Sequence, residues 1–246
     1  VISGSLVRIR QEAQRKAGKD NTFLAFFVII QYIISLNIKN MKVLLVNGSP
    51  HHKGCTFTAL QEIEKELQTQ GIETEIFWIG IRPLSGCMGC NYCLEAGRCC
   101  MEDSVNLFLE KAQQADGFIF GSPVHFASAT GALTSFMDRV FYGRAKLFSN
   151  KPAAAIASCR RGGSSTTFDQ LNKYFTISNM PVASSNYWNT VHGNTPEEVA
   201  KDIEGLQTMR ILARNMAWLL KCIEAGKQAG INPPAFEARI NTNFIR

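Results

Sequence analysis

Residues 41–56 read MKVLLVNGSPHHKGCT and predict a buried strand that opens through a loop into a helix. The run 41–47 is almost continuously apolar, which is typical of a parallel strand covered on both faces. A Gly-Ser-Pro sequence ends that run, because glycine and proline punctuate regular structure. Residues 56–70 then carry apolar side chains at helical spacing and stop at a glycine.

The same alternation continues along the chain. Further strands are expected at 73–79, 117–120, 151–158 and 180–184, with helices at 103–114, 130–142, 166–175 and 196–226. This order predicts an α/β fold with a doubly wound, five-stranded parallel sheet. Ligands in such sheets bind beyond the carboxyl ends of the strands. The loops 48–56, 122–126 and 158–163 follow strands one, three and four, so we expect them to share one ligand-binding edge.

Composition limits the classes of function. Of the 246 residues, 46% are hydrophobic and 19% are charged, which excludes a disordered, collagen-like or coiled-coil chain. The formal net charge is +6, but residues 1–40 hold six Lys and Arg against two Asp and Glu and so carry +4 of it. The rest of the chain is nearly neutral, so we expect no nucleic-acid partner.

An N-terminal extension, residues 1–40, precedes the expected domain at 41–230, and a tail at 231–246 follows it. Residues 23–38 are mostly apolar but shorter than the roughly 20 residues that cross a bilayer. They follow a basic segment, as in a signal peptide, yet no clear small-residue cleavage site precedes Met41. We interpret the extension as translated upstream sequence with Met41 as the true start, and the alternative is an interfacial membrane anchor.

The loop 48–56 has the chemistry of a phosphate site without a standard nucleotide motif. It lacks the second glycine of the dinucleotide fingerprint and the Lys-Ser/Thr pair of a Walker loop. It supplies the Ser49 and Thr56 hydroxyls, the flexible Gly54 and backbone N–H groups at a helix N-terminus, which together suit a phosphate monoester. The plain alternative is a strand-to-helix turn capped by Thr56.

Three segments resemble the NADPH-dependent FMN reductase family, which has a flavodoxin-like fold: MKVLLVNGSPHHKGCT, FGSPVHFASATGALTSFMDR and ASCRRGG. The resemblance covers residues 41–230 and implies FMN as the cofactor and NAD(P)H as the electron donor. It implies that the FMN phosphate contacts Ser49, His51, Lys53, Gly54, Cys55 and Thr56. The isoalloxazine ring would contact Ser122, Pro123, Val124, His125 and Phe126, and the third segment would contribute Cys159, Arg160, Arg161 and Gly162.

The loop 158–163 also has a chemical role that follows from its residue types. Reduced flavin carries negative charge near N1, and a cationic side chain or backbone N–H groups can stabilise that charge. Arg160 or Arg161 can supply the cation, and Gly162 and Gly163 can supply the N–H groups. The alternative is that the paired arginines are merely solvated charges.

Five of the eight cysteines lie within 14 residues. The first three recur every third residue, so a short coil can present three thiolates to the corners of an iron–sulfur cubane while a fourth closes the site. We predict a [4Fe–4S] cluster on Cys87, Cys90, Cys93 and Cys99, with Cys100 as the alternative fourth ligand. The pattern also resembles the compact motif of iron–sulfur flavoproteins, which carry the cluster loop after strand two. A redox disulfide, thiols left in a reductase without a cluster, and zinc remain alternatives.

These features predict an FMN-dependent oxidoreductase or electron-transfer flavoprotein that works in the reducing cytoplasm. The expected acceptor is a redox partner protein or a small molecule, and the resemblance implies a homodimer or homotetramer. No acid, base or nucleophile is expected, because flavin electron transfer requires none. The alternatives are a non-catalytic thiol-based redox sensor and a membrane-tethered flavoprotein that uses residues 23–38. Residues 186–189 follow the expected fifth strand and either cover a substrate or pack in a dimer.

Overall fold

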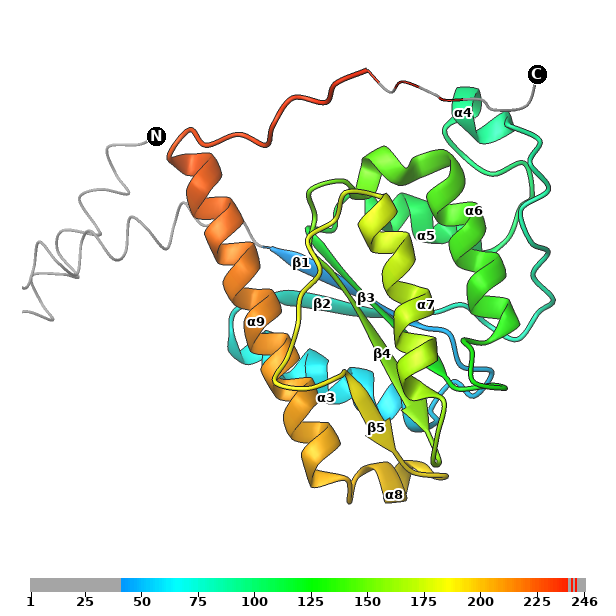
Figure 1. Cartoon of the computed structure of the whole chain (residues 1–246), viewed down its shortest axis with the longest axis vertical. Helices are drawn as coiled ribbons and strands as arrows, with labels where there is room; N and C mark the ends of the chain where they lie inside the picture. The colour runs from blue at the N-terminus through cyan, green and yellow to red at the C-terminus, as the bar shows by residue number, and fades with distance from the viewer. Residues whose placement is uncertain (1–40, 239, 241, 243–246) are drawn as a thin grey trace, which may run out of the picture. The chain divides into compact units, whose positions relative to one another are not determined.

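The computed structural model describes residues 41–238, 240 and 242, so the expectations for residues 1–40 lie outside the described residues. The chain from Met41 onward forms one compact unit, with helices on both faces of a central sheet (Figure 1). Within the described residues, no helix has the length and apolar content that a membrane span requires.

The sheet confirms the predicted fold class. Its strands are β1 (Lys42–Asn47), β2 (Glu73–Trp78), β3 (Gly117–Pro123), β4 (Ala153–Cys159) and β5 (Thr190–His192). All neighbouring strands pair in parallel, in the order β2-β1-β3-β4-β5. The chain direction across the sheet reverses at β1, so the switch point lies between β1 and β3, where a ligand crevice is expected.

Seven helices lie in the described part of the chain. They are α3 (Cys55–Thr69), α4 (Tyr92–Ala96), α5 (Ser104–Ala112), α6 (Gly131–Phe148), α7 (Ser164–Ile177), α8 (Pro196–Val199) and α9 (Ile203–Gln228). All but the short α4 pack against the sheet. One core packs α3, α8 and α9 against one face of the sheet, and a second, Phe-rich core packs α5, α6 and α7 against the other. Successive residues of β1 alternate between these cores: Leu44 and Val46 enter the second, while Val43 and Leu45 enter the first.

The predicted fifth strand was wrong in position. Residues 180–184 do not form a strand; Pro181 has no N–H to donate to a ladder, and Val182 makes only an isolated bridge. The chain joins the sheet later, after the buried Asn189, whose Nδ2 donates to the backbone oxygen of Ala155 over 3.0 Å. β5 therefore pairs only with the carboxyl end of β4.

The predicted helix 196–226 is two helices, and α4 was not predicted. Thr195 caps α8, and Asp202 caps α9 by accepting a hydrogen bond from the backbone N–H of Gly205. These two N-cap residues, seven positions apart along the chain, start two separate helices rather than one. α4 is a single short helix between residues in the left-handed region, and its sequence has no helical periodicity long enough to detect.

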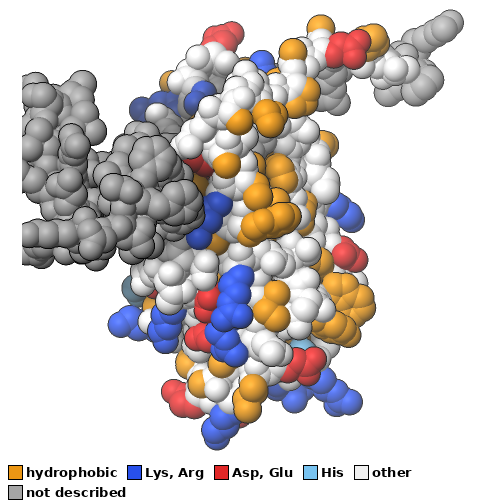
Figure 2. Space-filling view, turned by 90° about the vertical axis from the view of Figure 1, so that its left-hand side faces the viewer, with side chains coloured by type: hydrophobic (Ala, Val, Ile, Leu, Met, Phe, Trp, Pro, Cys, Tyr) orange, Lys and Arg blue, Asp and Glu red, His pale blue; other side chains and the backbone are white. Residues whose placement is uncertain are grey.

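The first of the two cores, between the sheet and α3, α8 and α9, is closed at its rim by ion pairs between helices. Arg210 pairs with Glu62 over 2.5 Å, and Arg214 pairs with Glu66 over 2.8 Å. Figure 2 shows acidic and basic side chains interspersed on one face of the molecule. That distribution is the one expected of a domain with little net charge.

Candidate flavin edge and cysteine cavity

The loops after β1, β3 and β4 lie together at one edge of the sheet, as predicted. The backbone N–H of Gly48 donates to the oxygen of Gly121 over 2.8 Å. The hydroxyls of Thr56 and Ser158 lie 2.8 Å apart, and the N–H of Val124 donates to the oxygen of Ser158 over 2.9 Å. We call the loops 48–56, 122–128 and 159–163 the flavin edge.

The first loop is held rigid by its own polar groups. The side-chain oxygen of Asn47 accepts from the N–H of Ser49, and its Nδ2 donates to the oxygen of His52, each over 3.0 Å. The buried Ser49 hydroxyl accepts from the N–H of His51 over 3.1 Å. Trp78 at the end of β2 donates from Nε1 to the oxygen of Ser49 and stacks on His52 with ring centroids 4.4 Å apart. No sequence pattern predicted this support by Trp78, because it depends on the pairing of β2 with β1, which places Trp78 beside Asn47.

The N-terminus of α3 is suited to an anion. Gly54 is its N-cap, no side chain caps it, and its first turn has no acidic residue. The partial positive charge of the helix end is therefore left without a neutralising group of its own. Lys53 is exposed beside it. The Cys55 thiol donates to the oxygen of Gly193 over 3.7 Å, and burial raises the pKa of this thiol, which keeps it uncharged.

The second loop exposes an aromatic ring on a strained turn. Phe126 is fully exposed with φ 52°, and Ala127 follows with φ 57°. Residues other than glycine rarely adopt this left-handed backbone conformation, and those that do are often found at ligand sites. A Cβ on Gly163 would lie 2.8 Å from the Ala127 Cα and 2.9 Å from the Val124 Cγ1, so only glycine lets the two loops meet.

The remaining predicted flavin contacts differ in exposure. Ser122 is buried, and its hydroxyl accepts from the N–H of Thr130 over 3.0 Å. Cys159 is buried at the end of β4, where burial raises its pKa. Pro123 and Val124 are half-buried, and the exposed ones are His125, Arg160, Arg161 and Gly162. The flavin edge thus combines an apolar ring, two exposed cations and a helix N-terminus.

The four predicted cluster ligands line one small cavity, which we call the cysteine cavity. It has a volume of about 20 Å³ and is lined by Cys87, Met88, Cys90, Asn91, Cys93, Cys99, Cys100, Met101, Arg139 and Tyr142. The sulfurs of Cys90 and Cys100 lie 3.6 Å apart. A hydrogen bond from the backbone N–H of Tyr92 lowers the pKa of Cys90, whereas burial raises that of Cys93.

No preformed site for a single metal ion exists among the described residues, because no three His, Cys, Asp or Glu side chains are arranged to hold one. All eight cysteines are free thiols. The cavity therefore gathers the thiols without fixing them in metal-ligand geometry.

Arg139, which was not predicted from the sequence, organises the loop around Cys99. Arg139 is 3% exposed, and its guanidinium donates from Nε to the Cys99 sulfur over 3.2 Å. It forms a bidentate pair with Asp103, with distances of 2.6 and 3.0 Å, and also donates to the backbone oxygens of Ser85 and Met101. The only sequence feature that pointed to this role was a charged residue on the apolar face of α6. The partners of Arg139 lie 36 and 40 positions away, too far for a local pattern to reveal them.

A buried amide holds the same segment from α5. Asn106 accepts from the N–H of Cys99 over 2.8 Å and donates to the oxygens of Cys99 and Met101 over 3.0 and 3.1 Å. Arg139 and Asn106 thus fix Cys99 from two helices, whereas Cys87, Cys90 and Cys100 remain exposed. One side of the cavity is rigid and the other is open.

α6 connects the flavin edge to the cysteine cavity (Figure 1). At its start, the Thr130 hydroxyl accepts from the N–H of Leu133 and donates to the oxygen of Gly48. Arg139 lies nine residues further on, which is roughly 14 Å along a helix axis. One helix therefore sets the spacing between the two regions.

Close packing of α4 on α6 gives a first prediction. A Cβ on Gly143 would lie 2.1 Å from the Cys93 sulfur, so Gly143→Ala must displace Cys93. We expect this variant to lower the free energy of unfolding by about 1–3 kcal/mol, as overpacking does. The measurement is urea denaturation of the full chain.

Gly226→Ala is the matched control for that experiment, because its Cβ would meet only Ile231 at 3.8 Å. We expect it to be neutral or to stabilise by up to about 1 kcal/mol, since alanine favours a helix. Equal effects of the two substitutions would contradict the close contact between Gly143 and Cys93.

The amino-acid sequence matches a known protein family and several known proteins. Residues 41–195 match the family model described as NADPH-dependent FMN reductase. An iron–sulfur flavoprotein of Methanocaldococcus jannaschii is 35% identical over 195 residues, covering 75% of this chain and 100% of that protein. An iron–sulfur flavoprotein of Archaeoglobus fulgidus is 26% identical over 190 residues, covering 73% of this chain and 97% of the relative.

A solved structure agrees at the level of the fold. RosB with a bound intermediate, 8-demethyl-8-formylriboflavin-5'-phosphate, superposes with a TM-score of 0.60 at 19% identity. The match covers 84% of this chain and 93% of RosB. This likeness supports the flavodoxin-like architecture.

Proposed function

Since the chain belongs to the NADPH-dependent FMN reductase family, we propose that it binds FMN at the flavin edge and passes electrons from NAD(P)H through it. The observation that carries the proposal is the uncapped N-terminus of α3 beside the exposed loops after β3 and β4. The helix end offers the N–H donors that a flavin phosphate requires. The loops offer the apolar cover that a flavin ring requires.

Bound FMN would supply hydride and single-electron transfer. The protein's own residues bind and orient it. The first turn of α3 and Lys53 would hold the phosphate, and Phe126 would cover the ring. Arg160 or Arg161 would balance negative charge at the ring edge. No side chain is required to transfer a proton.

We further propose that the cysteine cavity holds a [4Fe–4S] cluster on Cys87, Cys90, Cys93 and Cys99. The donor set fits, because four thiols at the predicted spacing line one cavity. A cluster supplies single-electron transfer. The volume of about 20 Å³ is small, so the exposed side of the loop has to open to accept the cluster while Arg139 and Asn106 hold Cys99. The name of the Methanocaldococcus jannaschii relative supports this proposal.

A thiol-based redox switch is the second candidate function. The contact of 3.6 Å between the sulfurs of Cys90 and Cys100 favours it, because loss of two electrons and two protons would join them in a disulfide. Mass spectrometry after air oxidation separates the two candidates. A mass lower by two hydrogens, in protein that never binds iron, favours the switch.

Charge at the start of α3 tests the FMN proposal. Cys55→Asp places a carboxylate at the first helical position, where it suits the helix dipole but repels a phosphate. We expect FMN affinity to fall at least about tenfold. The measurement is quenching of FMN fluorescence as flavin-free protein is added.

Cys55→Asn is the matched control, since it has the same shape without the charge. We expect its FMN affinity to stay within about threefold of that of the unmodified chain. If the Asp and Asn variants bind FMN equally, the phosphate does not lie at this helix end.

The working environment and partners are also proposals. We place the chain in a reducing compartment, the cytoplasm, because its eight free cysteines include three exposed thiols in one short loop. The acceptor is a redox protein or a small molecule, and the assembly is a homodimer or homotetramer. Sedimentation analysis of the FMN-loaded chain tests the assembly.

A further inference from the structure

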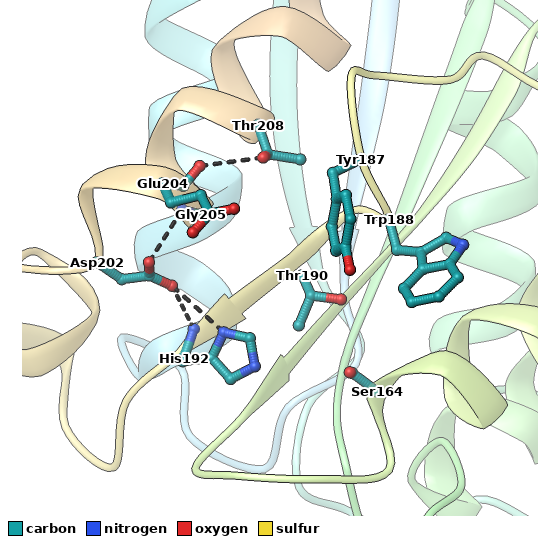
Figure 3. Close-up of a pocket in the computed structure, with 9 residues that line it drawn as sticks. All are labelled: Ser164, Tyr187, Trp188, Thr190, His192, Asp202, Glu204, Gly205 and Thr208. Atoms are coloured by element: carbon teal, nitrogen blue, oxygen red, sulfur yellow. Dashed lines mark hydrogen bonds and ion pairs between the residues drawn. The ribbon is translucent and has the colours of Figure 1, made fainter.

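A pocket beside β5 adjoins the flavin edge but shares none of the residues expected to contact FMN. It has a volume of about 340 Å³ and lies between the start of α7, the segment before β5, β5 itself and the first turns of α9 (Figure 3). We call it the β5 pocket. Ser164, on its α7 side, directly follows the loop 159–163.

The floor of this pocket contains a polar group without a partner. Thr190 is 8% exposed, and within the described residues its Oγ1 has no hydrogen-bond partner. Figure 3 shows this hydroxyl directed towards the space between Tyr187, Trp188 and Ser164. A buried hydroxyl without a partner destabilises a fold, and nearly all such groups in proteins are satisfied. The oxygen itself is buried, so a ligand group in that space would satisfy it once the side chains that cover it moved aside.

Two aromatic side chains form one wall. Tyr187 is 63% exposed and Trp188 is 56% exposed, with ring centroids 5.1 Å apart and planes tilted by 55°. Their backbone is fixed, because the Ser185 hydroxyl donates to the oxygen of Tyr187 over 2.5 Å and the buried Asn189 is bonded to β4. Exposed rings on a fixed turn can rotate to admit and stack on a planar ligand.

The opposite wall disfavours a negatively charged ligand. Asp202 and Glu204 line it together with His192, and no Lys or Arg is among the lining residues of the described chain. Asp202 accepts from the N–H groups of His192 and Gly205 over 2.6 and 2.9 Å, so its carboxylate is fixed in place. Two carboxylates disfavour a phosphate or other anion, in contrast to the flavin edge.

We propose that the β5 pocket is a second small-molecule site, which takes an uncharged planar aromatic ring carrying a hydroxyl or amide group. The ring stacks on Tyr187 and Trp188, and its polar substituent bonds the Thr190 hydroxyl. The site shares no residue with the expected FMN contacts, so flavin absorbance separates failure of one proposal from failure of the other.

The test is calorimetric titration of the full, FMN-loaded chain with 4-hydroxybenzamide and with the anion 4-hydroxybenzoate. We expect one saturable site for the amide and at least about tenfold weaker binding of the anion, because of the two carboxylates. Thr190→Val should bind the amide about fivefold more weakly, whereas Thr190→Ser, which keeps the hydroxyl, should bind it as the unmodified chain does.

A stability measurement keeps the proposal testable if binding is weak. Without ligand, Thr190→Val should melt at the same or a higher temperature, because it removes an unpartnered hydroxyl. A lower melting temperature, equal binding by the Val variant, or equal binding of amide and anion would overturn the proposal. Absence of a saturable site for the amide would also overturn it, and dissociation of an oligomer by Trp188→Ala would then identify the aromatic wall as a contact between copies of this chain.

Discussion

Replacement of Arg139 by methionine is expected to lower the free energy of unfolding by about 3 kcal/mol. Methionine fills a similar volume but leaves the Asp103 carboxylate, whose side chain is only 27% exposed, without its bidentate partner. The Cys99 sulfur and the backbone oxygens of Ser85 and Met101 lose donors as well. The measurement is urea denaturation of the full chain.

Two further variants identify the cause of this loss. Arg214→Met removes an exposed guanidinium from its pair with Glu66, and we expect a cost of no more than about 1 kcal/mol. Adding Asp103→Asn to Arg139→Met should recover about 1 kcal/mol, since it removes the stranded charge. A cost for Arg139→Met no larger than that for Arg214→Met would contradict the structural role assigned to Arg139.

Replacement of Cys93 by serine is expected to reduce bound iron to less than about one tenth of the four atoms per chain that a [4Fe–4S] cluster contains. Among Cys87, Cys90 and Cys93, Cys93 is the least exposed. Its thiol is therefore the hardest for another group to replace as a ligand. The measurement is iron and acid-labile sulfide analysis after anaerobic purification, alongside the FMN content, which should not change.

Matched variants make that experiment specific. Cys222→Ser, an exposed thiol on α9, should leave the iron content unchanged. Comparing Cys99→Ser with Cys100→Ser identifies the fourth ligand, and we expect the larger loss for Cys99, which Arg139 and Asn106 hold in place. Iron contents that do not differ among these variants would contradict the ligand assignment.

The parts of the fold that depend on local pattern could be predicted from the sequence. β1 is a continuous apolar run, and its buried residues lie on both faces of the sheet, as a parallel strand requires. The convergence of three loops at one edge also followed from strand order alone. The spacing of Cys87, Cys90 and Cys93 predicted that one short coil presents their thiols together, and in the structure all three line one cavity.

The features that were missed depend on contacts between distant residues. β5 has three residues, too few for a periodic signal, and Asn189 directs it into the sheet through a bond to Ala155. Arg139 is separated from Asp103 by 36 positions, so no local pattern links them. The unpartnered hydroxyl of Thr190 is likewise a property of the packed structure.

The proposed FMN-dependent electron transfer is tested most directly by the visible spectrum of the anaerobically purified chain, with iron and sulfide analysis and NAD(P)H added to the same sample. We expect one FMN per chain, flavin bands that bleach on addition of NAD(P)H, and a broad additional absorbance that accompanies four iron atoms. Flavin bands without iron would remove the cluster and leave the FMN proposal intact. A chain that binds no flavin even after reconstitution with FMN would contradict the central claim.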